Sequence, residues 1–388
     1  MTKITDIPAI RFKGFSDTWE QRKLGEIGSV SMCRRIFKEQ TSENGEIPFY
    51  KIGTFGGEAD AFISRELFEE YKAKYQYPKK GDILISASGS IGRTVVFTGK
   101  NEYFQDSNIV WLNHDKHLDN SFLKCFYSIV KWAGIEGSTI KRLYNDNILN
   151  TAITLPSVEE QQKIGAYFEN LDNLITLHQR KYDKLTNVKK SMLEKMFPQN
   201  GSNVPEIRFK GFTEAWEQRK VSELFKVTRG YVLAATLTEP AKTDKMPYPV
   251  YSSQTKDNGL MGYYKDYLYE DAITWTTDGA NAGTVNYRAG KFYCTNVCGV
   301  LLSNEVTANQ MIAEALNNVA KGYVSYVGNP KLMNNVMADI EIMIPTHAEE
   351  REKLSVFFRN LDTLITLHQR ELEKLKKLKK ACLEKMFV

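Results

Sequence analysis

PAIRFKGFSDTWEQRK at residues 8–23 returns almost unchanged as PEIRFKGFTEAWEQRK at residues 205–220. Twelve of these sixteen positions are identical, and Ser16/Thr213 and Asp17/Glu214 are conservative replacements. Self-similarity at so long a spacing indicates two structural units of one kind in tandem. We therefore expect each unit to begin with this leader segment and to bury a core of its own.

A second repeated segment closes each unit. LDNLITLHQR at 171–180 matches LDTLITLHQR at 361–370, and both continue through Lys- and Leu-rich sequence to LEKMF, at 193–197 and 383–387. One stripe of side chains recurs there at three- and four-residue steps, which predicts two long helices that each pack on another helix. The side chains expected at that interface are Leu171, Ile175, His178 and Leu185 in the first helix, and Leu361, Ile365, His368 and Leu375 in the second.

Both long helices are expected to start just after a proline. Their entries read ITLPSVEEQQKI at 153–164 and IMIPTHAEEREKL at 342–354. We expect Ser157 and Thr346 to cap the helices, and the early glutamates suit the positive end of the helix dipole. Neither helix can bury so long a stripe against itself. We therefore expect the two helices to pair antiparallel, with packing of each helix on its own domain as the alternative.

Between the repeated segments lie two middles that differ strongly from each other. Strands are expected near 49–52, 82–86 and 108–112, and helices near 120–132 and 307–320. The chain divides into a leader (1–23), a first middle (24–155), a long helix (156–200), a second leader (201–220), a second middle (221–344) and a second long helix (345–388). The predicted fold class is α+β, with two homologous mixed α/β domains separated by a long antiparallel two-helix coiled coil in a pseudo-two-fold tandem repeat.

A common skeleton survives in the two middles. GDILISASGSIG at 81–92 corresponds to EDAITWTTDGANAG at 270–283, and FQDSN at 104–108 to FYCTN at 292–296. A constant frame with changed loops suits two different binding specificities. Arg or Lys can bind guanine, Asn or Gln can bind adenine, and glycine turns let backbone N–H groups approach phosphate. The loop residues expected to contact DNA are Lys51, Ser88, Ser90, Arg93, Gln105, Asn108, Lys141, Arg142 and Asn145 in the first middle, and Ser253, Gln254, Lys256, Asn281, Arg288, Asn296, Lys331 and Asn334 in the second.

The composition places few limits on function. A formal net charge of +5 permits a polyanionic partner without requiring one. Five cysteines, scattered and odd in number, fit a reduced, cytoplasmic protein. No stretch approaches the roughly 20 apolar residues of a spanning helix, and the N-terminal sequence lacks the apolar segment of a signal peptide. We therefore expect no membrane association.

The duplicated leader, the GDILISASGSIG strand and loop, and the two proline–glutamate helix entries together resemble the specificity (S) subunit of type I restriction–modification systems. The likeness covers essentially the whole chain, and its parts follow in the family's order. It implies that each middle is a target recognition domain that reads one half of a bipartite, asymmetric site in double-stranded DNA. It also implies that the paired helices act as a spacer and as the dock for two modification (M) subunits.

The same resemblance implies that the chemistry is done by partners. The M subunits would bring S-adenosylmethionine and methylate adenine, and restriction (R) subunits would use ATP and Mg for translocation and cleavage. No cofactor is expected in this chain. The leader aromatics, Trp19 among them, fit either support of the adjoining domain or docking of an M subunit, and we favour a structural role.

The two halves also depart from simple duplication. The loop from Gly279 to Gly283 is longer than the loop from Gly89 to Gly92. The second helix entry has Arg351-Glu352 where the first has Gln161-Gln162. Contact residues therefore cannot be transferred between the halves by alignment alone.

Two other functions compete with DNA recognition. An enzyme would need a catalytic motif, but the sequence has neither a Gly-x-x-x-x-Gly-Lys-[Ser/Thr] phosphate loop nor the Asn/Asp-Pro-Pro-aromatic run of adenine methyltransferases. His114 with His117, and Cys294 with Cys298, lack companion ligands, so we expect no catalytic residue and no metal site. A coiled-coil scaffold or adaptor without sequence preference is the alternative, but it does not explain why the middles diverge.

Overall fold

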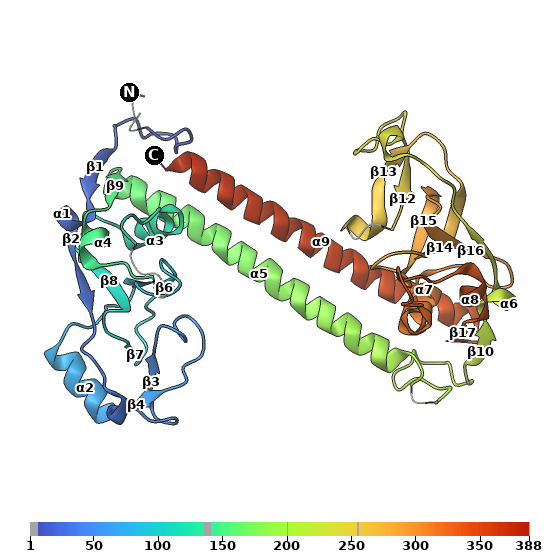
Figure 1. Ribbon diagram of the computed structural model, residues 1–388, viewed down its shortest axis with the longest axis horizontal. Helices are drawn as coiled ribbons and strands as arrows, with labels where there is room; N and C mark the ends of the chain where they lie inside the picture. The colour runs from blue at the N-terminus through green and yellow to red at the C-terminus, as the bar shows by residue number, and fades with distance from the viewer. Residues whose placement is uncertain (1–6, 136–140, 200, 254–255, 388) are drawn as a thin grey trace. The chain divides into compact units, whose positions relative to one another are not determined.

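The computed structural model describes residues 7–135, 141–199, 201–253 and 256–387, which fold into two compact units (Figure 1). Unit 1 comprises Met1–His178 together with Glu371–Val388, and unit 2 comprises Gln179–Arg370. Each unit holds one mixed α/β domain and a part of each long helix, α5 (Val158–Met196) and α9 (Ala348–Met386). Unit 1 is therefore assembled from both ends of the chain.

The domain of unit 1 contains three small sheets. Its elements are β1 (Glu20–Lys23), α1 (Leu24–Ile27), β2 (Gly28–Met32), η1 (Lys38–Gln40), β3 (Ile47–Tyr50), β4 (Phe62–Ile63), α2 (Arg65–Lys74), β5 (Ile83–Ser86), β6 (Thr94–Val96), β7 (Tyr103–Phe104), β8 (Ile109–His114), α3 (Asn120–Ile129), α4 (Asn145–Leu149) and β9 (Ala152–Leu155). The strand orders are β2-β8-β5-β6, β4-β3-β7 and β1-β9.

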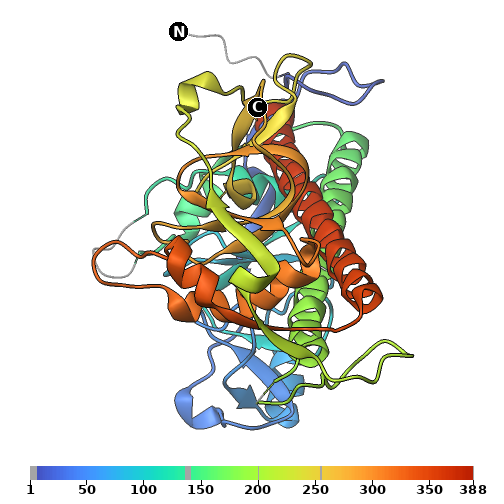
Figure 2. The same ribbon diagram turned by 90° about the vertical axis from the view of Figure 1, so that its right-hand side faces the viewer.

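The domain of unit 2, which faces the viewer in Figure 2, has one larger, six-stranded sheet beside a two-stranded one. Its elements are β10 (Glu217–Lys220), α6 (Val221–Leu224), β11 (Phe225–Arg229), η2 (Ala235–Leu237), β12 (Tyr248–Tyr251), η3 (Lys256–Gly259), β13 (Leu260–Tyr264), β14 (Tyr269–Thr276), β15 (Val285–Cys294), β16 (Cys298–Ser303), α7 (Gln310–Val319), η4 (Ala320–Tyr323), α8 (Asn334–Asp339) and β17 (Glu341–Ile344). The strand orders are β11-β16-β14-β15-β12-β13 and β10-β17.

The two domains share strand pairing as well as element order. β5 pairs antiparallel with β8 as β14 pairs with β16, and β3 pairs parallel with β7 as β12 pairs with β15. At one equivalent pair of facing residues the side-chain sizes differ between the domains. Ile85 lies opposite Val110 in domain 1, whereas the larger Trp275 lies opposite the smaller Gly299 in domain 2. A Cβ on Gly299 would lie 2.1 Å from the Trp275 ring. Close packing therefore preserves one scaffold under two sequences.

The expected strands and helices of the middles are present, with ends that differ by at most three residues. The predicted strands correspond to β3, β5 and β8, and the predicted helices to α3 and α7. The predicted α+β fold class is confirmed. The compact units nevertheless cut across the linear division of the chain, because residues 371–388 belong to unit 1.

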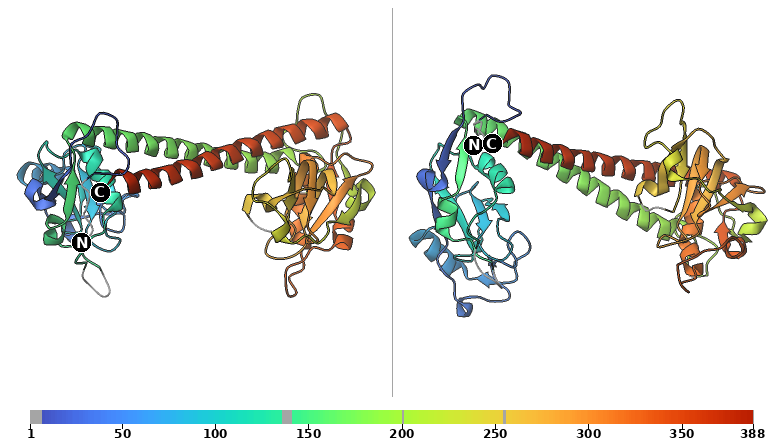
Figure 3. Two further views of the ribbon diagram at one scale, coloured as in Figure 1. Left: turned by 90° about the horizontal axis from the view of Figure 1, so that it is seen from above. Right: turned by 45° about the horizontal axis from the view of Figure 1, so that its top comes forward.

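The long helices run antiparallel within each unit. In unit 1 the Tyr167 hydroxyl lies 3.4 Å from Cys382 Sγ, and Asp172, one turn further along α5, pairs with Lys379, nearly one turn earlier in α9. Figure 3 shows the green start of α5 beside the red end of α9 there. In unit 2 Lys189 of α5 pairs with Asp362 of α9 at 2.6 Å. The rings of Phe197 and Phe358 are 5.7 Å apart in the same unit.

The segment between the proline and the start of the helix is one residue longer before α9 than before α5. Ser157 precedes α5 directly, and its Oγ accepts a hydrogen bond from the N–H of Glu160 at 3.4 Å. Helix α9 begins at Ala348, so His347 takes the position of Ser157. The expectation that Thr346 caps α9 is therefore wrong. Its hydroxyl bonds instead to the carboxylate of Glu214, at 3.3 Å.

Both leaders are built into their domains. Arg11 makes a bidentate pair with Glu160, at 2.7 and 2.8 Å, and Arg208 makes the same pair with Glu350 at the same distances. The N–H of Ile10 donates to the carbonyl of Lys385 at 2.9 Å, and the N–H of Ile207 donates to the carbonyl of Lys195 at 2.8 Å. Each leader thus ties the start of one long helix to the end of the other. Trp19 and Trp216 are buried beneath them.

Candidate nucleic-acid interface

In domain 1, three loops are joined by backbone hydrogen bonds at the ends of the sheet strands. The N–H of Ala87 donates to the carbonyl of Asn108 at 2.7 Å, and the N–H of Leu143 donates to the carbonyl of Ala87 at 2.8 Å. The N–H of Gly89 donates to the carbonyl of Lys141 at 3.0 Å. Gly89 has a φ of +64°, a left-handed conformation that favours glycine. These loops, 86–92, 105–108 and 141–145, form the loop edge of domain 1.

Domain 2 repeats this set of hydrogen bonds with different residues. The N–H of Thr277 donates to the carbonyl of Val297 at 3.0 Å, and the N–H of Leu332 donates to the carbonyl of Thr277 at 2.9 Å. The N–H of Gly279 donates to the carbonyl of Pro330 at 2.9 Å. The loops 276–283, 295–297 and 330–334 therefore form the equivalent loop edge of domain 2.

The shared hydrogen bonds align the two loop edges residue by residue, which sequence alone could not do. Ala87 matches Thr277 and Leu143 matches Leu332, so the positions beside them also correspond. The resulting pairs are Ser88 with Asp278, Arg142 with Lys331, Tyr144 with Met333, and Asn145 with Asn334. The framework is constant, and the side chains that it presents are not.

Four of the residues expected to contact DNA meet around one cavity of about 320 Å³ in domain 1. Ser88, Asn108, Arg142 and Asn145 all line it. Ser88 is 4% exposed, and its hydroxyl donates to Oδ1 of Asn108 at 2.7 Å. This internal bond fixes the orientation of the Asn108 amide, which leaves the cavity with a defined polar wall.

The pair Arg142 and Lys331 shows how the two loop edges differ in charge. Arg142 is exposed, and its guanidinium has no ion pair among the residues that the structure describes. Lys331 Nζ lies 3.7 Å from Oδ1 of Asp278, at the position where domain 1 has Ser88. The first edge thus presents an arginine that pairs with no carboxylate of the described residues, and the second presents a weak, partly exposed ion pair.

The other cationic candidates of domain 1 sit at or near this edge. Lys141 and Ser90 are exposed. Arg93 is also exposed, donates to the carbonyl of Ile52 at 3.0 Å, and lies over the Phe55 ring. Lys51 forms a surface pair with Asp60 at 2.8 Å, which leaves its ammonium partly neutralised.

Two candidates point into the protein. The side-chain oxygen of Gln105 accepts a hydrogen bond from the N–H of Ile52 at 2.9 Å. Arg288 is 9% exposed, donates to Thr274 Oγ1 at 3.0 Å, and stacks 3.7 Å from the centre of the Tyr251 ring. Burial lowers the pKa of its guanidinium. Gln105 and Arg288 therefore hold the loops in place from behind.

The remaining candidates of domain 2 are divided between its loops. Asn281 Nδ2 donates to the carbonyl of Ser253 at 3.2 Å, which ties the loop after β14 to the loop after β12. Asn296 is exposed in the turn between β15 and β16. Lys256 is the first residue of η3, and Gln254 lies outside the described residues.

The residues expected at the helix interface divide between the two units. Leu171 belongs to the core of unit 1, and Leu375 packs against that core. Leu361 belongs to the core of unit 2, and Leu185 packs against that core. The remaining members of the stripe, Ile175, His178, Ile365 and His368, are half-buried.

The described part of the chain contains no group of three or more His, Cys, Asp or Glu side chains placed to hold a metal ion. None of its helices is both long enough and apolar enough to cross a membrane.

Comparison with known proteins places these two domains. The family model described as the type I restriction modification DNA specificity domain matches twice, at residues 16–187 and 213–377. The chain belongs to this family.

Relatives of this specificity family support the placement. A Haemophilus influenzae protein named for a type I restriction enzyme specificity subunit is 60% identical over 158 residues, which are 40% of this chain and 41% of that protein. A Mycoplasma pneumoniae protein named for the N-terminus of a type I specificity subunit is 39% identical over 147 residues, which are 37% of this chain and 75% of that protein.

One solved structure shares the whole fold. The crystal structure of a type I restriction–modification S subunit from M. genitalium superposes with a TM-score of 0.74 and covers 98% of this chain and 99% of that one. At 16% identity this likeness establishes the fold alone.

The specificity domains also present residues beside their loop edges that the sequence did not single out. Arg34 and Arg35 are exposed directly after β2, and Tyr231 and Val232 are exposed at the equivalent place after β11. The N–H of Tyr231 donates to the carbonyl of Cys294 at 3.2 Å, which holds this turn against β15. In the sequence, the Arg-Arg pair at the end of a strand could have indicated a binding surface. The Tyr-Val pair could not, because apolar residues there suggest a buried core.

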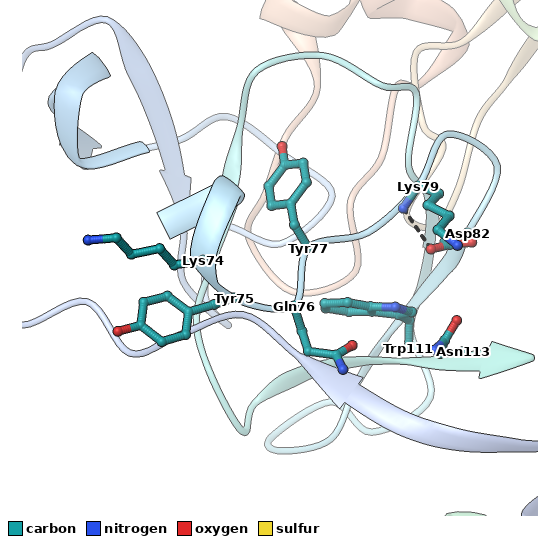
Figure 4. A pocket seen from close by; sticks show the side chains of 8 residues that line it. All are labelled: Lys74, Tyr75, Gln76, Tyr77, Lys79, Asp82, Trp111 and Asn113. Carbon is teal, nitrogen blue, oxygen red and sulfur yellow. Dashed lines mark hydrogen bonds between the residues drawn. The ribbon is translucent and has the colours of Figure 1, made fainter. Parts of the chain in front are cut away.

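Domain 1 extends its basic edge with two hollows beneath the end of α2. Lys74, Tyr75, Gln76, Tyr77, Lys79, Asp82, Trp111 and Asn113 line a hollow of about 530 Å³, in which Gln76 and Trp111 lie between the two lysines (Figure 4). Tyr75 and Gln76 also line a second hollow of about 460 Å³ with Arg34 and Arg35. The Arg34 guanidinium lies 5.2 Å from the Tyr75 ring centre. Cations on an aromatic floor suit contacts to a phosphate backbone.

Proposed function

We propose that this chain is the specificity subunit of a type I restriction–modification complex, and that each domain reads one half of a bipartite, asymmetric DNA target. One observation carries the proposal. Two loop edges with the same backbone hydrogen bonds present Arg142 and Tyr144 in domain 1 but Lys331 and Met333 in domain 2. A constant frame with exchanged contact residues is what two unlike half-sites require.

Within this proposal the candidate residues take three roles. Arg142 reads guanine and Asn145 reads adenine in domain 1. At the place equivalent to Asn145, Asn334 Nδ2 donates to the carbonyl of Thr228 at 3.4 Å, so Asn334 holds its loop in domain 2. Side chains that bind the sugar–phosphate backbone are Lys51, Ser90, Arg93, Lys141, Ser253, Gln254, Lys256, Asn296 and Lys331. Side chains that shape the edges from within are Ser88, Gln105, Asn108, Asn281 and Arg288.

The duplication supports the proposed number of M subunits, and the proposed cofactors rest on the family to which the chain belongs. Leu174 and Leu177 of the first LITLHQR segment are exposed, as are Leu364 and Leu367 of the second. Equal surfaces on two helices favour two copies of one partner, which we propose to be M subunits carrying S-adenosylmethionine. R subunits with ATP and Mg would join them, the chain itself would perform no chemistry, and the complex would act in the cytoplasm.

The long helices contribute a further element of specificity. Helices α5 and α9 each supply residues to both units, at 158–178 and 179–196 and at 348–370 and 371–386. We propose that their length sets the unread spacer between the half-sites. Inserting one helical turn into both helices should change the methylated spacer and leave both half-sites as they are. Methylation of the original spacing by that variant would contradict this role.

Methylome sequencing of cells that carry this chain with its M partner tests the main proposal. We expect one bipartite methylated motif, and exchange of residues 221–344 for another middle should change one half of it only. A change in both halves would refute the assignment of one half-site to each domain. A complex that shows no preference among labelled duplexes would favour the scaffold or adaptor instead.

A further inference from the structure

Domain 2 places four apolar side chains in solvent along one short segment, 323–333. Tyr323, Tyr326, Val327 and Met333 are 49%, 71%, 93% and 51% exposed. Val327 has the largest exposed fraction of any large hydrophobic side chain in the part of the chain that the structure describes. Exposed apolar side chains that are grouped in one short segment, rather than scattered singly, are typical of a binding site.

The segment is held in shape by the domain. The N–H of Ser325 donates to the carbonyl of Lys331 at 2.8 Å, and the N–H of Lys331 donates back to the carbonyl of Ser325 at 2.9 Å. Gly328 makes the turn with a φ of +79°. Ser325–Lys331 is therefore a closed hairpin, here named the wedge hairpin, with Tyr326 and Val327 at its tip. Figure 2 shows this stretch as an orange-red loop standing away from the strands.

The base of the wedge hairpin is anchored in the core. Leu332 is fully buried, and its carbonyl accepts a hydrogen bond from Trp275 Nε1 at 3.1 Å. The carbonyl of Pro330 accepts from the N–H of Gly279 at 2.9 Å. A tip fixed in this way loses little conformational freedom when it binds, because its backbone is already ordered.

The position of the hairpin favours DNA as its ligand. Lys331 closes the hairpin and is also part of the loop edge of domain 2, next to Asn334. In the sequence, GIEGSTI at 134–140 precedes Lys141, whereas YVSYVGN at 323–329 precedes Pro330, the residue of domain 2 that matches Lys141 in the loop edge. A dock for M subunits would be needed in both halves, whereas this apolar tip belongs to the sequence of one domain only.

We infer that the wedge hairpin inserts Tyr326 and Val327 into the minor groove and parts a base step at the half-site read by domain 2. This inference rests on the proposed function, because it uses the same loop edge. Apolar side chains that enter the minor groove unstack a base step and bend the duplex, and Lys331 is placed to hold an adjacent phosphate. Pyrimidine–purine steps deform most easily. We therefore expect such a step in or beside this half-site.

The test uses the complex of the full chain with its M subunits and a duplex that carries the target found by methylome sequencing. 2-Aminopurine replaces one base at a time along the second half-site, because its fluorescence rises when it is unstacked. Methyltransferases flip their target base out of the stack, so a rise at the methylated adenine belongs to the M subunits. We expect a rise at one further step, the wedged step, with the native chain. The variant Tyr326→Ser/Val327→Ser should lose that rise and bind about tenfold more weakly. Its salt dependence should stay unchanged, because no phosphate contact is removed.

Leu237→Ser is the matched control, because Leu237 is 53% exposed in η2 and lies outside the loop edge. It should leave both the fluorescence and the affinity unchanged. A native complex that binds its target without a rise at any position other than the methylated adenine overturns the wedge but leaves the proposed function intact. A Tyr326→Ser/Val327→Ser variant that keeps the rise, or that no longer co-purifies with M subunits, also overturns it, the latter in favour of a protein partner.

Discussion

The Trp275 ring fills the space that a side chain at Gly299 would need. We therefore expect the effects of substitutions at these two positions on the stability of unit 2 to depend strongly on each other. A Cβ on Gly299 would lie 2.1 Å, 2.2 Å and 2.3 Å from three atoms of the Trp275 ring, so the variant Gly299→Val forces the indole aside. Overpacking costs about 1–3 kcal/mol. Loss of the Trp275 Nε1 bond to the carbonyl of Leu332 adds about 1 kcal/mol. We expect unit 2 to lose about 2–4 kcal/mol of unfolding free energy.

The second variant supplies the compensation. Trp275→Ile alone leaves a cavity and should cost about 2–3 kcal/mol, less than truncation to alanine. Trp275→Ile/Gly299→Val recreates the Ile85–Val110 pair that domain 1 uses at this rung. A volume-conserving exchange costs less than about 1.5 kcal/mol, and the lost hydrogen bond adds about 1 kcal/mol. The double variant should therefore lose roughly 2 kcal/mol less than the sum of the single losses.

Urea titration followed by hydrogen-exchange mass spectrometry measures these values separately for each unit. Peptides from β14 and β16 report on unit 2, and peptides from β5 and β8 of unit 1 serve as the internal control. A double variant as unstable as the sum of the two single changes would refute the reasoning. So would Gly299→Val with native stability, because the ring would then have room that the structure does not show.

Three further outcomes follow from the buried charges and the loop edge. Arg208→Met leaves Glu350, which is fully buried, without its partner and should lower the unfolding free energy of unit 2 by about 3–5 kcal/mol in chemical denaturation. A loss below about 1 kcal/mol would contradict this. Burial lowers the pKa of Lys189, but the Glu314 and Asp362 carboxylates raise it more, so the folded pKa lies above the ordinary 10.5. The stability that the charged Lys189 contributes is complete below pH 10.5 and is lost as pH rises through its folded pKa. The Tm gap between the native chain and Lys189→Met should therefore stay constant from neutral pH to pH 10.5 and narrow above it. Arg142→Ala should cost about 1–3 kcal/mol of discrimination at one position of the first half-site, and a methylome in which the second half-site also relaxes would show that the domains do not read separately.

The repeated segments made the architecture accessible from the sequence. The two LITLHQR segments carry a helical stripe, and the helix entries mark where α5 and α9 begin, so fold class and antiparallel pairing followed directly. The sequence could not show that residues 371–388 complete unit 1, because membership in a compact unit depends on tertiary contacts. It also misplaced the cap of α9, since one extra residue puts His347 at the helix start.

The candidate interface was accessible only in part. Ser88 and Arg142 follow strand and loop signals, and the structure brings them to one cavity. Gln105 and Arg288 also carry polar side chains, but these bond to groups of their own domain. The residue type alone does not show whether a polar side chain faces DNA or the protein interior. Tyr326 was missed for the opposite reason, because an aromatic residue is usually counted as core and its exposure appears only in three dimensions.

The composition of unit 1 from both ends of the chain has a consequence for synthesis. Residues 1–178 leave the ribosome first, yet Phe387 stacks on Phe122 at 5.0 Å, and Cys382 and Met386 also belong to their core. Unit 2 is continuous in sequence, so it can close while the earlier-translated domain still exposes that apolar surface. The domain of unit 1 is thus translated first but completes its core last. A stop codon after residue 370 would destabilise unit 1 and leave unit 2 with all of its residues.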